Sequence, residues 1–229
     1  MKIVGVTGTK NTGKTTLVEK IVEGLSGEGY HVATLKHSHK SFDFPGRDTD
    51  RHRKAGAEIV AGSGRETFIL VDREMDFDEI IAAIDILDSV DFIVVEGFES
   101  MEYANISTST PNEFTVKVVD PFKLEDVDEL IAIIKKRSYG LLQGLDCGKC
   151  GFESCREFAA AKVRGDADEV DCRSQPDRAL LKINGKPVPL NPFVQNFVSK
   201  AVLGMVDALD TENLKIEKVD LIIKCQRNR

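Results

Sequence analysis

Shortly after its start the chain reads Gly8-Thr9-Lys10-Asn11-Thr12-Gly13-Lys14-Thr15, a Gly-x4-Gly-Lys-[Ser/Thr] pattern. The apolar run Ile3-Val4-Gly5-Val6 precedes it, and residues 17–22 follow with apolar positions at helical spacing. This strand–loop–helix context indicates a phosphate-binding loop, because glycines let backbone N–H groups turn toward an anion without a Cβ in the way. The helix that follows directs the positive end of its dipole at the same anion. The residues expected to line this nucleotide-binding loop are Gly8, Lys10, Asn11, Thr12, Gly13, Lys14, Thr15 and Thr16.

A buried strand with an acid at its carboxyl end is the second informative feature. The run Phe92-Ile93-Val94-Val95 has no polar position, as in a parallel strand covered on both faces, and Glu96-Gly97 follows it directly. This is the Walker B arrangement, so we expect Glu96 to lie beside the phosphate loop. Thr15 and Glu96 are the predicted magnesium ligands, and Lys14 supplies positive charge to the phosphates.

The loop after the second predicted strand, residues 30–35, is dense in titratable groups. Ligands of open α/β sheets bind at the carboxyl ends of strands, so we interpret residues 36–48 as a substrate and metal loop. His37, His39 and Arg47 are its candidate substrate contacts. Asp43 or Asp48 is a further candidate for magnesium, directly or through water. A solvated loop is the alternative for each single residue.

The order of predicted elements favours an α/β fold: a P-loop NTPase with a mostly parallel sheet, followed by a small C-terminal α+β domain. We expect a P-loop domain over residues 1–138, a four-cysteine domain over 139–178 and a ββαβ segment over 179–229. That last segment contains an Asn-Gly hairpin, a helix that starts at Pro192, and a final strand over residues 215–224.

Composition excludes several classes of protein. The 229 residues carry a formal net charge of −7, which argues against a nucleic-acid-binding surface. No apolar run is long enough to cross a bilayer and no signal-peptide pattern opens the chain, so we expect a cytoplasmic protein.

Four of the five cysteines lie close together, at Cys147, Cys150, Cys155 and Cys172. In a cytoplasmic protein such clustering indicates a metal site rather than disulfides. The spacing C-x2-C-x4-C-x16-C suits a [4Fe–4S] cluster held by four thiolates. Zinc is the rival metal, although zinc ribbons usually pair two C-x2-C knuckles and this stretch has one. Cys225 stands apart and is interpreted as a small core residue.

The first 140 or so residues resemble the molybdopterin-guanine dinucleotide biosynthesis protein B (MobB) family. The resemblance is carried by residues 8–16, 36–39, 45–48, 51–57 and 95–98. It implies a dimeric GTP-binding P-loop protein with weak GTP hydrolysis that assists the nucleotidyl transferase joining GMP to molybdopterin, or related maturation proteins of molybdoenzymes. No Asn-Lys-x-Asp segment, which reads guanine in many GTPases, occurs here.

The cysteine stretch is similar to the four-cysteine [4Fe–4S] module of corrinoid iron–sulfur and carbon monoxide dehydrogenase-linked proteins, including its Cys-Gly-x-Cys-Gly opening at Cys147. Simple MobB proteins lack this module. An alternative function is therefore a redox- or metal-responsive P-loop metallochaperone or binding module that uses nucleotide as a switch.

Overall fold

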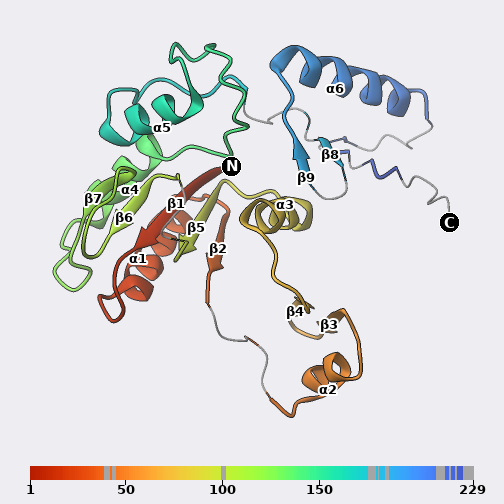
Figure 1. Ribbon diagram of the computed structural model, residues 1–229, viewed down its shortest axis with the longest axis horizontal. Coiled ribbons are helices and arrows are strands. Elements are labelled where there is room, and N and C mark those ends of the chain that lie inside the picture. The colour runs from red at the N-terminus through yellow and green to blue at the C-terminus, as the bar shows by residue number, and fades with distance from the viewer. Residues whose placement is uncertain are drawn as a thin grey trace.

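The computed structural model describes residues 1–38, 42, 45–98, 102–174, 179, 181–183, 186–209, 215–216, 218–219 and 221–223. Its centre is a five-stranded, wholly parallel sheet of order β2-β5-β1-β6-β7 (Figure 1). The strands are β1 (Lys2–Thr7), β2 (Val32–Lys36), β5 (Phe92–Glu96), β6 (Asn105–Ser107) and β7 (Thr115–Val118). The predicted α/β class and mostly parallel sheet are confirmed.

Helices cover both faces of this sheet. On one face α1 (Lys14–Gly27) and α4 (Val127–Arg137) pack their apolar sides against Val4, Val94 and Ile106. On the other, α3 (Phe77–Leu87) packs Phe77 and Ile81 against β1 and β5. Because β1 and β5 are buried on both sides, their sequences are almost continuously apolar, as the pattern predicted.

The short strand β6 was not predicted. It has three residues and includes the polar Asn105 and Ser107, so it lacks the apolar pattern that marks a strand. Neither side chain is left unpaired on burial: Asn105 bonds to Thr7 and Thr115, and Ser107 donates to the Thr110 carbonyl. Hydrogen bonding thus replaces hydrophobic burial at this position.

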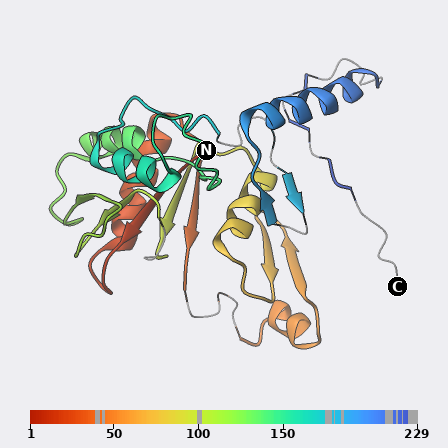
Figure 2. The ribbon, with the colours of Figure 1, turned by 45° about the horizontal axis from the view of Figure 1, so that its top comes forward.

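An appendage formed by α2 (Asp48–Lys54), β3 (Ile59–Ser63) and β4 (Thr67–Val71) lies apart from the sheet (Figure 2). Strands β3 and β4 pair only with one another, antiparallel. Helix α2 ends at Lys54, and Gly56 beyond it has a φ of 105° that an L side chain rarely adopts. The N-cap position of α2 is Arg47, whose side chain makes no capping hydrogen bond.

The four-cysteine segment, residues 139–174 of the described chain, begins at Tyr139, which forms an isolated bridge with Ile3 of β1. Within β1, only Gly5 to Thr7 pair with β6, and Ile3 instead donates its N–H to the Tyr139 carbonyl at 2.9 Å. Helix α5 (Cys155–Arg164) then packs Phe158 against Tyr139 and Phe114. The four-cysteine segment therefore sits at the amino ends of the strands.

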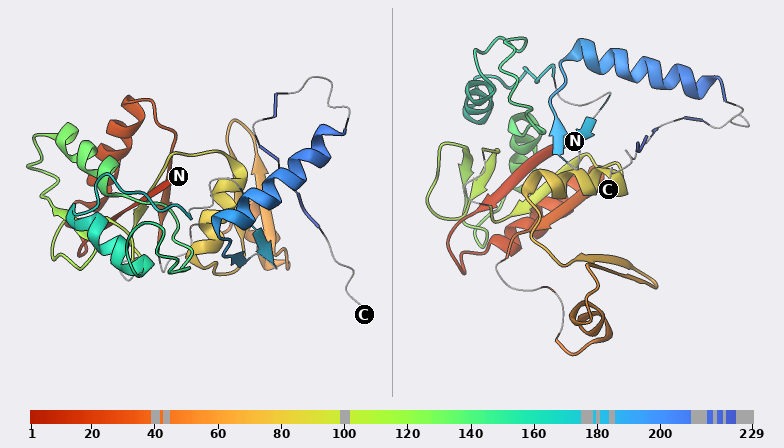
Figure 3. Two further views of the ribbon diagram at one scale, coloured as in Figure 1. Left: turned by 90° about the horizontal axis from the view of Figure 1, so that it is seen from above. Right: turned by 45° about the vertical axis from the view of Figure 1, so that its right-hand side comes forward.

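The C-terminal part contains the hairpin β8 (Leu181–Ile183) and β9 (Lys186–Val188), then α6 (Pro192–Asp207), which is drawn as a long separate helix in Figure 3. Asn191 caps α6 and Pro192 is its first residue, as predicted. The final strand expected over 215–224 is not formed by the described residues of that range. No helix among the described residues has the length and apolarity needed to cross a membrane.

Candidate functional site

The loop between β1 and α1 has the backbone shape that the Gly-x4-Gly-Lys pattern requires. Gly8, Asn11 and Gly13 have φ values of 134°, 64° and 84°. Gly13 precedes the first turn of α1, and neither a capping side chain nor an acidic residue occupies that turn. The N–H groups at the start of α1 therefore face the loop, and the positive end of the helix dipole favours an anion there.

Lys14 lies across this loop. Its Nζ atom donates to the carbonyls of Gly8 at 2.6 Å and Thr9 at 2.7 Å. Thr12 braces the loop by donating to the Thr9 carbonyl at 2.8 Å. Lys10 and Asn11 are exposed at its tip, and Thr16 is half-buried in the first turn of α1.

Glu96 ends β5 directly beside the loop, because β5 pairs in parallel with β1 and sets Glu96 opposite Val6. The Thr15 hydroxyl is 3.3 Å from both carboxylate oxygens of Glu96. Lys36, at the end of the neighbouring strand β2, donates to the same carboxylate at 2.9 Å. The structure thus brings together the two predicted magnesium ligands and adds Lys36, a contact that no local sequence pattern indicates. Hydroxyl and carboxylate oxygens are the donors that Mg²⁺ prefers.

The predicted substrate loop is only partly described. His37 packs its ring against Phe98, with 4.4 Å between the ring centroids. Gly97 has to be glycine, because a Cβ would meet His37 Cβ at 3.1 Å and its φ is 96°. His39 and Asp43 lie outside the described residues.

Arg47 and Asp48 are both exposed at the start of α2, and Asp48 pairs with Arg51 at 3.7 Å. Figure 1 shows α2 away from the phosphate loop. The roles suggested for Arg47 and Asp48 stay predictions.

Two further loops border the phosphate loop on the side away from Glu96. After β6, Ser109 accepts the Thr9 N–H at 3.2 Å, and Thr108 lies within 2.5 Å of the Thr12 hydroxyl oxygen. After β7, Lys20 of α1 donates to the Pro121 carbonyl at 2.9 Å. No local sequence pattern marks either loop as part of the site, because their contact with residues 8–15 follows from strand order.

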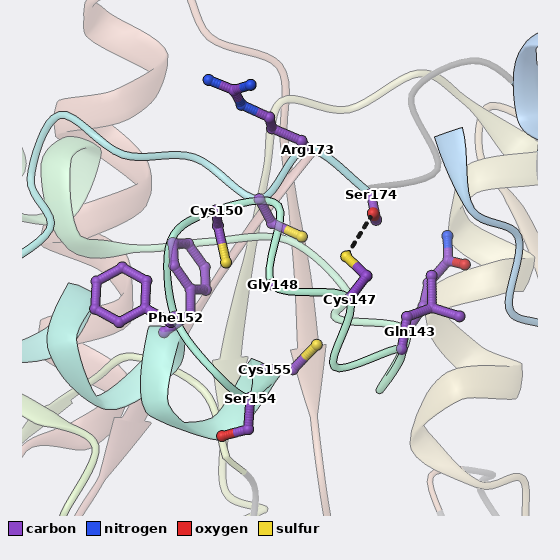
Figure 4. Close-up of a pocket in the computed structure, with 12 residues that line it drawn as sticks. Gln143, Cys147, Gly148, Cys150, Phe152, Ser154, Cys155, Arg173 and Ser174 are labelled. Carbon is purple, nitrogen blue, oxygen red and sulfur yellow. Dashed lines mark hydrogen bonds between the residues drawn. The ribbon is translucent and has the colours of Figure 1, made fainter. Parts of the chain in front are cut away.

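The four cysteines surround one recess (Figure 4). Cys155 is the first residue of α5, and Cys147, Cys150 and Cys172 come from the loops on either side of that helix. Phe152 and Phe158 form the apolar side of the recess, which opens to solvent. The fold therefore brings Cys172 back to the other three cysteines.

Two of the thiols have shifted pKa values. The Ser174 hydroxyl, 3.3 Å from the Cys147 sulfur, and the backbone N–H of Lys149 lower the pKa of Cys147. Burial raises the pKa of Cys172; the Ser174 backbone N–H opposes this shift, and the other three cysteines add to it. Burial therefore favours the neutral thiol of Cys172, and a metal that binds this residue as a thiolate must offset the cost of desolvating the charge.

The donor set fits a group that takes four thiolates. Among the described residues, no three His, Cys, Asp or Glu side chains converge closely enough to hold a single metal ion. All four cysteines instead line one recess, and Figure 4 labels Cys147, Cys150 and Cys155 there. Gly148 and Gly151 adopt positive φ values of 67° and 91°, so the loop turns sharply at both positions, and Gly148 itself lines the recess.

The recess and the phosphate loop lie at opposite ends of the sheet. The recess is next to the amino end of β1 through Tyr139, and the loop follows the carboxyl end of the same strand. Six residues of strand span roughly 20 Å at 3.3 Å per residue, so the two sites do not share ligands.

Residues 3–136 match the family described as "Molybdopterin guanine dinucleotide synthesis protein B" (MobB), and residues 142–174 match one described as "Putative Fe-S cluster". The chain is 29% identical to a "Putative molybdopterin-guanine dinucleotide biosynthesis adapter protein" of Methanocaldococcus jannaschii, over 96% of this chain and 97% of the relative. It is 32% identical to a "Probable molybdopterin-guanine dinucleotide biosynthesis adapter protein" of Bacillus subtilis, over 72% and 95%. The solved structure of Bacillus subtilis MobB superimposes with a TM-score of 0.40 at 30% identity, over 47% of this chain and 64% of that one. Since the first family match covers more than half of the chain, the chain belongs to the MobB family.

Proposed function

We propose that this protein is a GTP-binding adapter in molybdopterin guanine dinucleotide biosynthesis that hydrolyses GTP slowly and carries a [4Fe–4S] cluster. The names of its relatives support the pathway. The match of residues 142–174 supports an iron–sulfur cluster over zinc at Cys147, Cys150, Cys155 and Cys172. When bound, such a cluster exchanges single electrons.

One observation carries the nucleotide part of the proposal: the Thr15 hydroxyl and the Glu96 carboxylate meet at the phosphate loop, 3.3 Å apart. In this proposal Mg²⁺ binds between them and the phosphates. Lys14 exchanges its carbonyl partners for phosphate oxygens, and the amides from Gly8 to Thr16 complete the site.

Slow hydrolysis is part of the proposal. Glu96 lies beside the loop, and its carboxylate already accepts from Thr15 and Lys36. A carboxylate that holds a metal does not also orient the attacking water. Phosphoryl transfer without a water-positioning group is slower by orders of magnitude.

The proposal extends to partners and location. The protein would act in the cytoplasm as a homodimer, beside the nucleotidyl transferase or a molybdoenzyme maturation protein. The names of its relatives, which call them biosynthesis adapters, support a partner in this pathway. Residues 1–138 would form the nucleotide domain, 139–178 the cluster domain and 179–229 the C-terminal segment. Gln195 of α6 donates to the Ser174 carbonyl at 3.3 Å, which ties the last of these to the cluster segment.

Calorimetric titration of GTP with Mg²⁺ into wild type and Lys14→Ala tests the nucleotide site. We expect the variant to lose most of the affinity, whereas Lys136→Ala, which removes an exposed lysine of α4, leaves it unchanged. Equal GTP binding by wild type and Lys14→Ala would exclude the proposed site. Iron and sulfide assays on anaerobically prepared protein test the cluster, and zinc in their place would refute it.

A further inference from the structure

The loop after β7 presents an aromatic ring to the phosphate loop. A Cβ placed on Gly13 would lie 3.0 and 3.1 Å from two ring atoms of Phe122 and 3.1 Å from Pro121 Cγ. The Phe122 side chain is nevertheless 72% exposed, whereas Pro121 is buried. The ring therefore contacts the phosphate loop with its edge atoms and leaves most of its surface open.

This loop is fixed in position. Lys20, one turn and a half into α1, donates to the carbonyls of Pro121 at 2.9 Å and Leu124 at 3.5 Å. Asp120 Oδ1 accepts the N–H of Phe122 at 3.0 Å, and the Asp120 carbonyl accepts that of Lys123 at 3.1 Å. The helix that would hold the phosphates thus also holds the ring.

Strand order decides where a nucleoside would lie. Glu96 follows β5 on one side of β1, so the magnesium-bound end of a triphosphate lies on that side. The nucleoside extends from the other end, toward the loops after β6 and β7. Of these, the loop after β7 offers an exposed ring face and an exposed carboxylate.

We propose that residues 120–123 form the base site, with Phe122 stacking on a purine and Asp120 selecting guanine. This inference rests on the nucleotide-binding function proposed above and adds its specificity. A carboxylate accepts hydrogen bonds only, and guanine presents N1–H and N2–H₂ donors, whereas adenine presents an acceptor at N1. The Asp120 carboxylate also lies 3.5 Å from Lys123, but both side chains are exposed and such pairs are weak.

Calorimetric titrations of GTP, ATP and inorganic tripolyphosphate, each with Mg²⁺, test the base site. Base stacking on an aromatic ring is worth enough that we expect Phe122→Ala to bind GTP and ATP about 10-fold or more weakly. Tripolyphosphate, which has no base, should bind Phe122→Ala as it binds wild type. Phe122→Trp should retain GTP affinity, and Phe193→Ala, which removes an exposed ring of α6, should change nothing.

Asp120→Asn tests the selection of guanine, since its Oδ1 atom still accepts the Phe122 N–H. We expect it to weaken GTP about 10-fold or more without weakening ATP, because a charged acceptor is lost. If GTP binds in a Lys14-dependent manner but is unaffected by Phe122→Ala and Asp120→Asn, the base site is refuted and the nucleotide function stands. If wild type binds neither GTP nor tripolyphosphate, the nucleotide function fails and the base site fails with it.

Discussion

Lys162 is a buried cation inside the four-cysteine segment, and its replacement is the most direct test of how that segment is held together. The residue is 1% exposed. Its Nζ atom donates to the carbonyls of Ala167 at 3.1 Å, Asp168 at 2.9 Å and Val170 at 2.7 Å. These carbonyls belong to the turn that leads from α5 to Cys172, so Lys162 positions the fourth cysteine.

The magnitude follows from the three carbonyls. Lys162→Met keeps the length of the side chain but leaves the three acceptors without their donor, at about 1–3 kcal/mol for each that water does not reach. Asp171, 3.3 Å away, is largely exposed and adds little. We therefore expect a loss of about 3–5 kcal/mol in the free energy of unfolding of this segment, the range for removing one partner of a buried charged group.

Hydrogen exchange of the α5 amides, followed by mass spectrometry, measures this loss locally. At 1.4 kcal/mol for each factor of ten, protection of α5 in Lys162→Met should fall about 100-fold or more. Protection of β1 and α1 should change much less, and Lys200→Met, an exposed lysine of α6, should change neither. Reconstituted Lys162→Met should also lose iron to a chelator faster. Wild-type protection of α5 in Lys162→Met would refute the reasoning.

Four other outcomes are expected. Serine at Cys147, Cys150, Cys155 or Cys172 should lower bound iron below half of the roughly four atoms of a [4Fe–4S] cluster, and serine at Cys225 should not; equal iron in all five would contradict the ligand set. Glu96→Gln should weaken Mg²⁺-dependent GTP binding roughly 10-fold or more, with little effect in EDTA, and a matched loss without Mg²⁺ would argue for a different role. The Gly46 N–H, then Lys54 and Arg53, lower the pKa of Asp50 to about 2, so this carboxylate stabilises the appendage above its unfolded pKa of about 4 and the contribution disappears between pH 4 and 2. The hydrogen-exchange protection of the α2 amides should therefore fall between pH 4 and 2, and this fall should be smaller in Asp50→Asn. GTP affinity should be nearly independent of the cluster, because the sites lie at opposite ends of β1; a large dependence would favour the redox-responsive alternative.

Much of the nucleotide site could be predicted because its parts are local. Residues 8–15 specify their own loop through glycines at positive φ, and Glu96 follows a strand whose apolar pattern is unambiguous. The capping residues Asp76 and Asn191 likewise act on amides within the next turn. The expected final strand is not formed by the described residues of the range 215–224. A strand needs the edge of a partner strand as well as a suitable sequence, and a local pattern does not show whether such an edge is available.

By itself, the sequence determined the phosphate loop, the buried strand before Glu96, the set of four cysteines and the α/β class. Each of these depends on a pattern of residues that are close together along the chain. Only the tertiary structure decided which segments far apart in the chain become neighbours. It paired Lys36 with Glu96, brought Phe122 next to Gly13 and let Lys162 donate to carbonyls of the turn that leads to Cys172. It also separated the cysteine recess from the phosphate loop. Tyr139 pairs with Ile3 near the amino end of β1, where the short strand β6 does not reach, and the phosphate loop follows the carboxyl end of β1. The physical reason is that strand order and register, which arise from packing across the whole sheet, set these distances.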